Sequence, residues 1–306
     1  GAAPRRPSSQ PPARRRARSP AACAAALLAL LALGVPSGAQ ASAWTPEPGH
    51  GYAKLWLRWH AGFAFHDASG DRLELPRYHE LFVGAYADVG LADGLALFFR
   101  SDLLRTFHLE DPRSGDVARH LAPGDPSLGL RARVLLRDRW AMSLQASARA
   151  PLARSGEVQE VVRDRAPYPV VGGLRRGAGV WHLQGMWNIG AAFERVFLGA
   201  ALGYQWRGEG FEDRLLWNAT LGATLSPRVG ARLSLAGAHS LGFGSAPRAS
   251  TPSGLGNGAS WTTASLSADL RVAEGWYLGA ALETALLGLR TKSRGLSLAL
   301  SLGTQY

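Results

Sequence analysis

The chain has 306 residues, of which 46% are hydrophobic and 19% charged, and its formal net charge is +11. That apolar share, together with ten tryptophans, excludes an intrinsically disordered chain. Six of the 34 basic residues lie within residues 1–20, which hold no acid, so the remainder has 28 basic and 23 acidic residues and a net charge of +5. Over half of the surplus is confined to the N-terminus, and no nucleic-acid partner is expected.

The N-terminal segment has the organisation of a secretory signal peptide. Its basic start is followed by an apolar run at 21–35, a Pro-Ser-Gly break, and two overlapping small-residue cleavage sites that end at Ala41 and Ala43. The run of 15 residues is shorter than the ~20 needed to span a bilayer, which disfavours an anchoring helix. We expect residues 1–43 to be cleaved and residues 44–306 to form one exported domain.

From residue 44 onward the hydrophobic pattern has a period of two, which is typical of β-strands. In the segment 51–66, for example, Leu55, Leu57 and Trp59 alternate with polar residues such as Arg58. The pattern recurs twelve times, with apolar residues along one face of each segment. It predicts strands at 51–66, 78–90, 94–105, 127–137, 139–150, 179–192, 196–207, 214–225, 228–240, 260–272, 275–286 and 294–306.

The connections between these strands alternate in length. Short links such as Asp93-Gly94 and Ser226-Pro227 carry turn residues and suit antiparallel hairpins. Longer connections are expected at 67–77, 106–126, 151–178, 208–213, 241–259 and 287–293. Short turns at one end and long loops at the other are typical of a transmembrane up-and-down barrel, and an even number of strands places both termini at the short-turn end.

Alternation alone does not decide which face points outward, because a soluble lipocalin-like barrel alternates with its apolar face inward. Three features favour a membrane barrel: arginines share the polar face with many glycines, the chain ends in an aromatic residue, and large aromatic residues of the apolar face lie near strand ends. The latter residues are Phe63, Phe65, Trp140, Trp181, Trp206, Trp217 and Trp276. The final strand, ending in Tyr306, is similar to those that bacterial barrels present to their insertion machinery.

The predicted fold class is therefore all-β: an antiparallel transmembrane barrel of about 12 strands in the bacterial outer membrane, in contact with lipid and lipopolysaccharide. A secreted soluble all-β protein is the alternative.

Three stretches within residues 44–137 resemble a bacterial group of transporter-like outer-membrane proteins associated with the meta-pathway of phenol degradation. They are Trp-Thr-Pro-Glu-Pro-Gly-His-Gly-Tyr from Trp44, Tyr-Ala-Asp-Val-Gly-Leu-Ala-Asp-Gly-Leu from Tyr86, and Gly-Asp-Pro-Ser-Leu-Gly-Leu-Arg-Ala-Arg from Gly124. The resemblance implies a barrel that takes up or exports small molecules, with aromatic compounds as candidates. It supplies no catalytic residue.

The sequence offers no catalytic or metal site. Eight histidines are scattered without metal-ligand spacing, and the only cysteine, Cys23, leaves with the signal peptide. His239 and Ser240 come nearest to the His–Ser pair of outer-membrane phospholipase, but adjacent strand residues point to opposite faces. We expect neither an enzyme nor a cofactor.

The polar face of the strands remains as the candidate site. In mid-strand it carries six arginines against three acidic residues, and such charges are costly inside a barrel unless they are paired or hydrated. The predicted lumen-lining residues, as candidates for a solute or ion filter, are Arg58, Glu80, Arg100, Asp102, Arg131, Arg133, Arg149, His182, Arg232 and Glu283.

Two interpretations stay open. In one, the arginines line a narrow wet route for small anionic or polar molecules. In the other, arginines and acids pair into a closed structural or adhesive barrel whose long external loops bind polysaccharide or a partner protein. Inward small residues, among them Gly129, Gly203 and Gly222, favour open volume. The loop 151–178 is expected to constrict or cover the mouth or to be a mobile surface loop, and 241–259 to be flexible.

Overall fold

The computed structural model describes residues 43–110, 117–153, 177–246 and 252–306, so the predicted signal peptide lies outside it except for Ala43. Among these residues no helix is long and apolar enough to cross a membrane. The regular structure consists of β1 (Gly51–His66), β2 (Arg72–Ala92), β3 (Leu95–Glu110), β4 (Val117–Ala122), β5 (Ser127–Arg137), β6 (Trp140–Arg149), β7 (His182–Ala192), β8 (Val196–Arg207), β9 (Arg214–Ser226), β10 (Val229–Ser240), β11 (Ser260–Ala273), β12 (Trp276–Arg290) and β13 (Lys292–Gln305).

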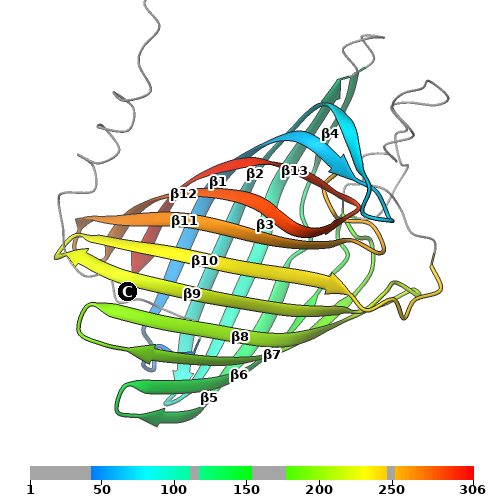
Figure 1. The fold of residues 1–306 in the computed structure, drawn as a ribbon. Coiled ribbons are helices and arrows are strands. Elements are labelled where there is room, and N and C mark those ends of the chain that lie inside the picture. Colours follow the sequence, from blue (N-terminus) through cyan, green and yellow to red (C-terminus); the bar gives the residue numbers. More distant parts are fainter. Residues whose placement is uncertain (1–42, 111–116, 154–176, 247–251) are drawn as a thin grey trace, which may run out of the picture.

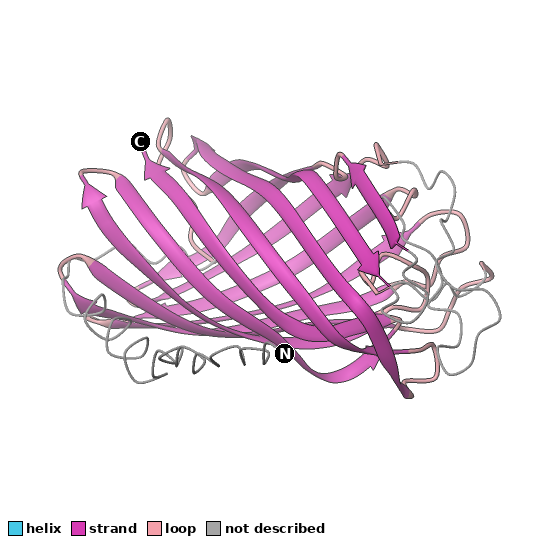
Figure 2. Cartoon of the chain, turned by 90° about the horizontal axis from the view of Figure 1, so that it is seen from above, coloured by secondary structure: helices cyan, strands magenta, loops and turns pink. Residues whose placement is uncertain are grey.

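Twelve of these strands close into an antiparallel barrel (Figure 1, Figure 2). Each strand pairs with its neighbours along the chain, and β1 closes the ring by pairing with β13. The exception is β4, which lies outside the ring. Strand β3 pairs with β5 through Leu95–Arg100 and with β4 through Arg105–Glu110. The predicted up-and-down barrel of about 12 strands is confirmed.

The two ends of the barrel differ as expected: short turns and the C-terminus lie at one end, and the longer connections at the other (Figure 1). Three predicted loops were wrong. In the connection 67–77, the residues from Arg72 onward already belong to β2. The connection 106–126 contains the end of β3 and all of β4, and only Thr291, with φ of 44°, separates β12 from β13. Register shifts in the β11–β12 ladder on either side of Thr262 interrupt the period of two, so the alternation does not reveal that β12 continues to Arg290.

The outer face of the barrel is apolar. Leucines from every part of the ring are exposed on it, and tryptophans and other aromatic residues lie near both ends. At the short-turn end these are Trp140, Phe193, Trp276 and Tyr306, and at the long-loop end Phe63, Trp181 and Trp206. This distribution matches a lipid-facing band between two aromatic girdles. Phe65 was placed wrongly: the bulge between Gly62 and Ala64 turns it inward, and it is fully buried.

The inward glycines leave less open volume than their size suggests. Aromatic rings from neighbouring strands lie over several of them, so that a Cβ at Gly129 would be 2.4 Å from the ring of Phe98. At Gly222 it would be 1.8 Å from Phe197. Rings that cover a strand glycine in this way restore packing that the missing side chain does not supply.

Candidate solute path in the barrel lumen

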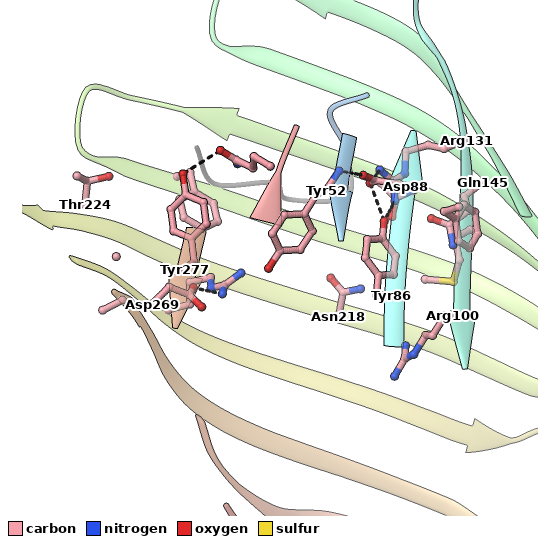
Figure 3. A pocket seen from close by; sticks show the side chains of 18 of the residues that line it. Tyr52, Tyr86, Asp88, Arg100, Arg131, Gln145, Asn218, Thr224, Asp269 and Tyr277 are labelled. Atoms are coloured by element: carbon pink, nitrogen blue, oxygen red, sulfur yellow. Dashed lines mark hydrogen bonds and ion pairs between the residues drawn. The ribbon is translucent and has the colours of Figure 1, made fainter. Parts of the chain in front are cut away.

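A cavity of about 420 Å³ lies in the lumen towards the short-turn end (Figure 3). Three tyrosine rings line it, together with five side-chain amides from four strands; these residues are Tyr52, Tyr86, Tyr277, Gln145, Gln184, Asn188, Asn218 and Gln305. The charged residues that line it are Asp88, Arg100, Arg131, Arg232 and Asp269. Because the wall alternates in and out, its polar residues converge here while the leucines of the same strands face lipid.

Two of the cavity's arginines are neutralised by carboxylates. Arg131 on β5 lies 3.4 Å from Asp88 on β2 and donates a hydrogen bond of 3.0 Å to the Tyr86 hydroxyl, which in turn donates to Asp88 at 2.7 Å. Arg232 on β10 pairs with Asp269 on β11. Sequence reasoning omitted Asp88 from the predicted lumen residues, although its two-residue spacing from Tyr86 and Gly84 places it on the polar face of β2.

Two other predicted arginines are also paired. Arg58 lies 3.2 Å from Glu283 across the intervening β13, with both side chains partly exposed to the lumen. Arg133 lies 2.5 Å from Asp93 in the β2–β3 turn, at the rim of the barrel. Arg133 therefore braces a short turn, whereas Arg58 belongs to the lumen wall.

Glu80 and Asp102 are held by an arginine that the alternation assigns to the wrong face. Arg105 donates from Nε to Glu80 Oε1 at 3.1 Å, and its Nη1 lies 3.6 Å from Asp102. Strict alternation along β3 would place Arg105 among the lipid-facing residues. The register shift between Val83 and Gly84, opposite Leu103 in β3, turns Arg105 inward, where it is buried.

A basic row runs along the lumen wall near the long-loop end. On successive neighbouring strands, Arg100 lies opposite Ser127, Ser127 opposite Arg149, Arg149 opposite His182, and His182 opposite Arg207. Directly opposed residues of antiparallel strands project from the same face, so these five side chains form one row. The sequence predicted Arg100, Arg149 and His182 as separate lumen residues, and the sheet register brings them together.

Residues 252–259, between β10 and β11, fold into the lumen and are called the inward loop below. Arg207 and Arg214 each donate from Nη2 to the Gly256 carbonyl oxygen at 3.3 Å, which ties the loop to the β8–β9 wall. The preceding side chain, Leu255, packs against a buried cluster on β2 and β3 formed by Tyr78, Phe107 and Leu109. These strand pairs lie on far sides of the ring, so the inward loop crosses the barrel.

Polar contacts hold the inward loop at several further points. Lys292 Nζ donates to the Ser253 carbonyl at 2.9 Å, and the Asn257 side chain accepts from the Glu212 amide at 2.7 Å. The expected flexibility of 241–259 is therefore wrong for 252–259, which are almost entirely buried. Most of the predicted constriction at 151–178 lies outside the described residues.

The first residues that the structure describes, 43–49, enter the lumen from the opposite end. The Trp44 ring lies against Gly190 on β7, where a Cβ would be 2.3 Å from it, and the Trp44 carbonyl accepts a hydrogen bond of 3.3 Å from Arg131. The Gly49 amide donates to the Gly90 carbonyl at 2.9 Å. Contacts to β7, β5 and β2 thus hold this segment inside the short-turn end.

His239 and Ser240 face different surroundings. His239 Nε2 lies 3.2 Å from the Thr262 hydroxyl, while the Ser240 hydroxyl donates to Glu212. They do not form a nucleophile–base pair. In the part of the chain that the structure describes, no group of three His, Cys, Asp or Glu side chains is placed to hold a metal ion. Near the β4–β5 connection, burial raises the pKa of Asp125, whose Oδ1 accepts a hydrogen bond of 2.9 Å from the Ala153 amide.

No protein-family sequence model and no curated protein sequence matches this chain. Its structure is similar to that of an outer membrane channel from Pseudomonas putida F1, at 14% sequence identity and a TM-score of 0.58, covering 89% of this chain and 100% of that one. It is also similar to the NanC porin, at 8% identity and a TM-score of 0.50, covering 82% of this chain and 100% of that one. The likeness concerns the fold, and together with the apolar outer face it makes this chain a β-barrel of the bacterial outer membrane.

Proposed function

We propose that the chain is a passive channel for small molecules in the outer membrane. The observation that carries this proposal is the polar cavity of about 420 Å³ inside a closed barrel whose outer face is apolar. A barrel that serves only as a scaffold is expected to fill its interior with side chains, whereas polar open volume suits water and polar solutes. The names of the two structural neighbours, a channel and a porin, support the same function.

The lumen limits this channel to small solutes. The inward loop crosses it near the long-loop end, and Trp44 occupies part of the short-turn end. Selectivity in such a passage comes from its width and from the charges and hydrogen-bonding groups along it.

The proposed preference is for anionic solutes, and it rests on fewer arginines than the sequence suggests. Four of the predicted arginines have a carboxylate partner, which weakens their electrostatic attraction for an anion in the lumen; they are Arg58, Arg131, Arg133 and Arg232. Arg100 and Arg149 have no carboxylate within ion-pair distance among the residues that the structure describes. These two arginines are the filter that we propose.

A closed structural or adhesive barrel is the second candidate. The inward loop and the four paired arginines favour it, because both reduce the open path. The suggested association with phenol degradation stays a prediction, as does recognition of Tyr306 by the barrel-insertion machinery.

Single-channel recording in a planar bilayer under a salt gradient tests the proposal. We expect discrete conductance steps with a reversal potential that indicates anion preference, and a loss of that preference in the double variant Arg100→Gln/Arg149→Gln. The control is the double variant Arg137→Gln/Arg139→Gln, which also removes two charges, from the exposed β5–β6 turn. Absence of conductance, with insertion confirmed by heat-modifiable gel migration, contradicts the channel and favours the closed barrel.

A further inference from the structure

We propose that Arg100 and Arg149 form a binding site for the carboxylate group of a small organic anion, whose body occupies the adjoining cavity. The proposal names a solute class for the channel and rests on that proposed function, because the ligand must enter the lumen to reach either arginine.

Arg100 differs from the other arginines of the cavity. It lines the cavity and is exposed to it, whereas Arg131 and Arg232 are engaged by Asp88 and Asp269. In Figure 3 its guanidinium group lies apart from the group formed by Asp88, Tyr86 and Arg131, with no contact drawn to it. A guanidinium on a wet cavity wall presents a planar fork that matches a carboxylate with two parallel hydrogen bonds.

Arg149 lies in the same row of the lumen wall as Arg100. One residue, Ser127, separates them in the cross-strand register, so their backbones are roughly 10 Å apart at the usual strand spacing. Arg149 is partly exposed, and both side chains project into the lumen. Two long side chains at this spacing can reach the same carboxylate from neighbouring strands.

The residues around this pair supply further arginines. His182, directly opposite Arg149, is a buried uncharged imidazole, and among the described residues neither of its ring nitrogens has a hydrogen-bond partner. Farther along the wall, Arg207 and Arg214 both donate to the Gly256 carbonyl. Cations gathered in a weakly hydrated space repel one another, and a bound anion relieves that repulsion.

The nearby acids have other hydrogen-bond or ion-pair partners, although Asp102 and Asp125 also attract Arg149 from beyond ion-pair distance. Asp102 lies 3.6 Å from Arg105, and Asp125 accepts the Ala153 amide. Glu80 is held by Arg105 and by a hydrogen bond of 3.2 Å from the Tyr78 hydroxyl. None of these acids comes within 4.0 Å of Arg100 or Arg149 in the described ion pairs, so the pair keeps its affinity for an external carboxylate.

The cavity next to the pair determines the size and chemistry of the part of the ligand that carries the carboxylate. Its rings, including Tyr86, Phe98 and Phe197, offer faces for an aromatic or sugar ring, and its amides offer hydrogen bonds to hydroxyl groups. About 420 Å³ accommodates a molecule with one or two rings. The expected ligand is therefore a ring-sized carboxylate and not a bare inorganic anion.

Isothermal titration of the purified protein in detergent micelles tests this site. The probes are benzoate and glucuronate, their uncharged counterparts benzyl alcohol and glucose, and inorganic phosphate. We expect at least one of the two carboxylates to bind and the uncharged compounds to show no measurable binding. Arg100→Gln and Arg149→Gln are each expected to weaken carboxylate binding by about tenfold or more. Arg100→Lys is expected to recover part of the loss, because it restores the charge without the planar fork.

The exposed Arg137→Gln serves as the charge-matched control and is expected to bind carboxylates like the parent protein. Equal binding of benzyl alcohol or glucose, equal binding by the double glutamine variant, or tighter binding of phosphate than of either carboxylate would each overturn the proposal. Binding in micelles together with a silent bilayer would leave the site intact and contradict the channel. Conductance without any carboxylate binding would do the reverse.

Discussion

The ion pair between Glu80 and Arg105 shows what a single inward charge costs in this barrel. Their side chains are 1% and 10% exposed, and Tyr78 donates a further hydrogen bond to Glu80. Removing one partner of a buried pair leaves an uncompensated charge, which costs about 3–5 kcal/mol. Arg105→Gln is therefore expected to lower the free energy of unfolding by that amount, measured by urea titration of the heat-modifiable folded form in micelles.

The pair of Arg58 and Glu283 provides the matched control. Its side chains are 24% and 30% exposed, so water compensates for much of a lost partner. Arg58→Gln is expected to cost less than about 1 kcal/mol in the same titration. Equal losses in the two variants would mean that burial of the Glu80 carboxylate does not decide the outcome.

Individual strands show a second constraint, in which rings from one strand fill the space over glycines of the next. The ring of Phe197 on β8 lies over Gly222 on β9, and the two are direct partners in the ladder. Gly222→Ala would place a Cβ 1.8 Å from that ring, so it is expected to destabilise the barrel by about 1–3 kcal/mol. The measurement is again the urea midpoint of the heat-modifiable form.

Gly185 on β7 is the control for this substitution. Among the described residues, apart from its two chain neighbours, no atom lies within 4 Å of the position that its Cβ would occupy, so Gly185→Ala is expected to be neutral or slightly stabilising. If the two alanine variants unfold at the same urea concentration, ring packing over Gly222 contributes nothing to stability.

At the scale of the whole barrel, the inward loop crosses the lumen. We expect this loop to limit conductance. Replacing 253–258 by two glycines removes the Leu255 and Gly256 contacts to both walls. We expect a several-fold increase in single-channel conductance, because the narrowest part of a passage dominates its resistance. Phe243→Ala, which alters an exposed side chain of the same connection, should leave conductance unchanged. An unchanged conductance in the loop variant would show that the constriction lies elsewhere.

Strand positions, their antiparallel order and the apolar outer face follow directly from the sequence. A period of two and the chemistry of tight turns are local properties, so segments such as 51–66 and 196–207 are recognised almost to the residue. Most predicted lumen residues lie inward for the same reason. The departures, Arg105 and Phe65, both follow bulges, which add one residue and exchange the two faces without a clear sequence signal.

Only the tertiary structure decided which inward charges have partners and which segments occupy the lumen. Arg131 is neutralised by Asp88, and the row from Arg100 to Arg207 assembles through the register of five strands. The inward loop has the composition of a flexible connection, yet contacts to walls on far sides of the ring hold it in place. Barrel closure brings together groups that are far apart in sequence, and the free energy of those contacts is not encoded in any local pattern.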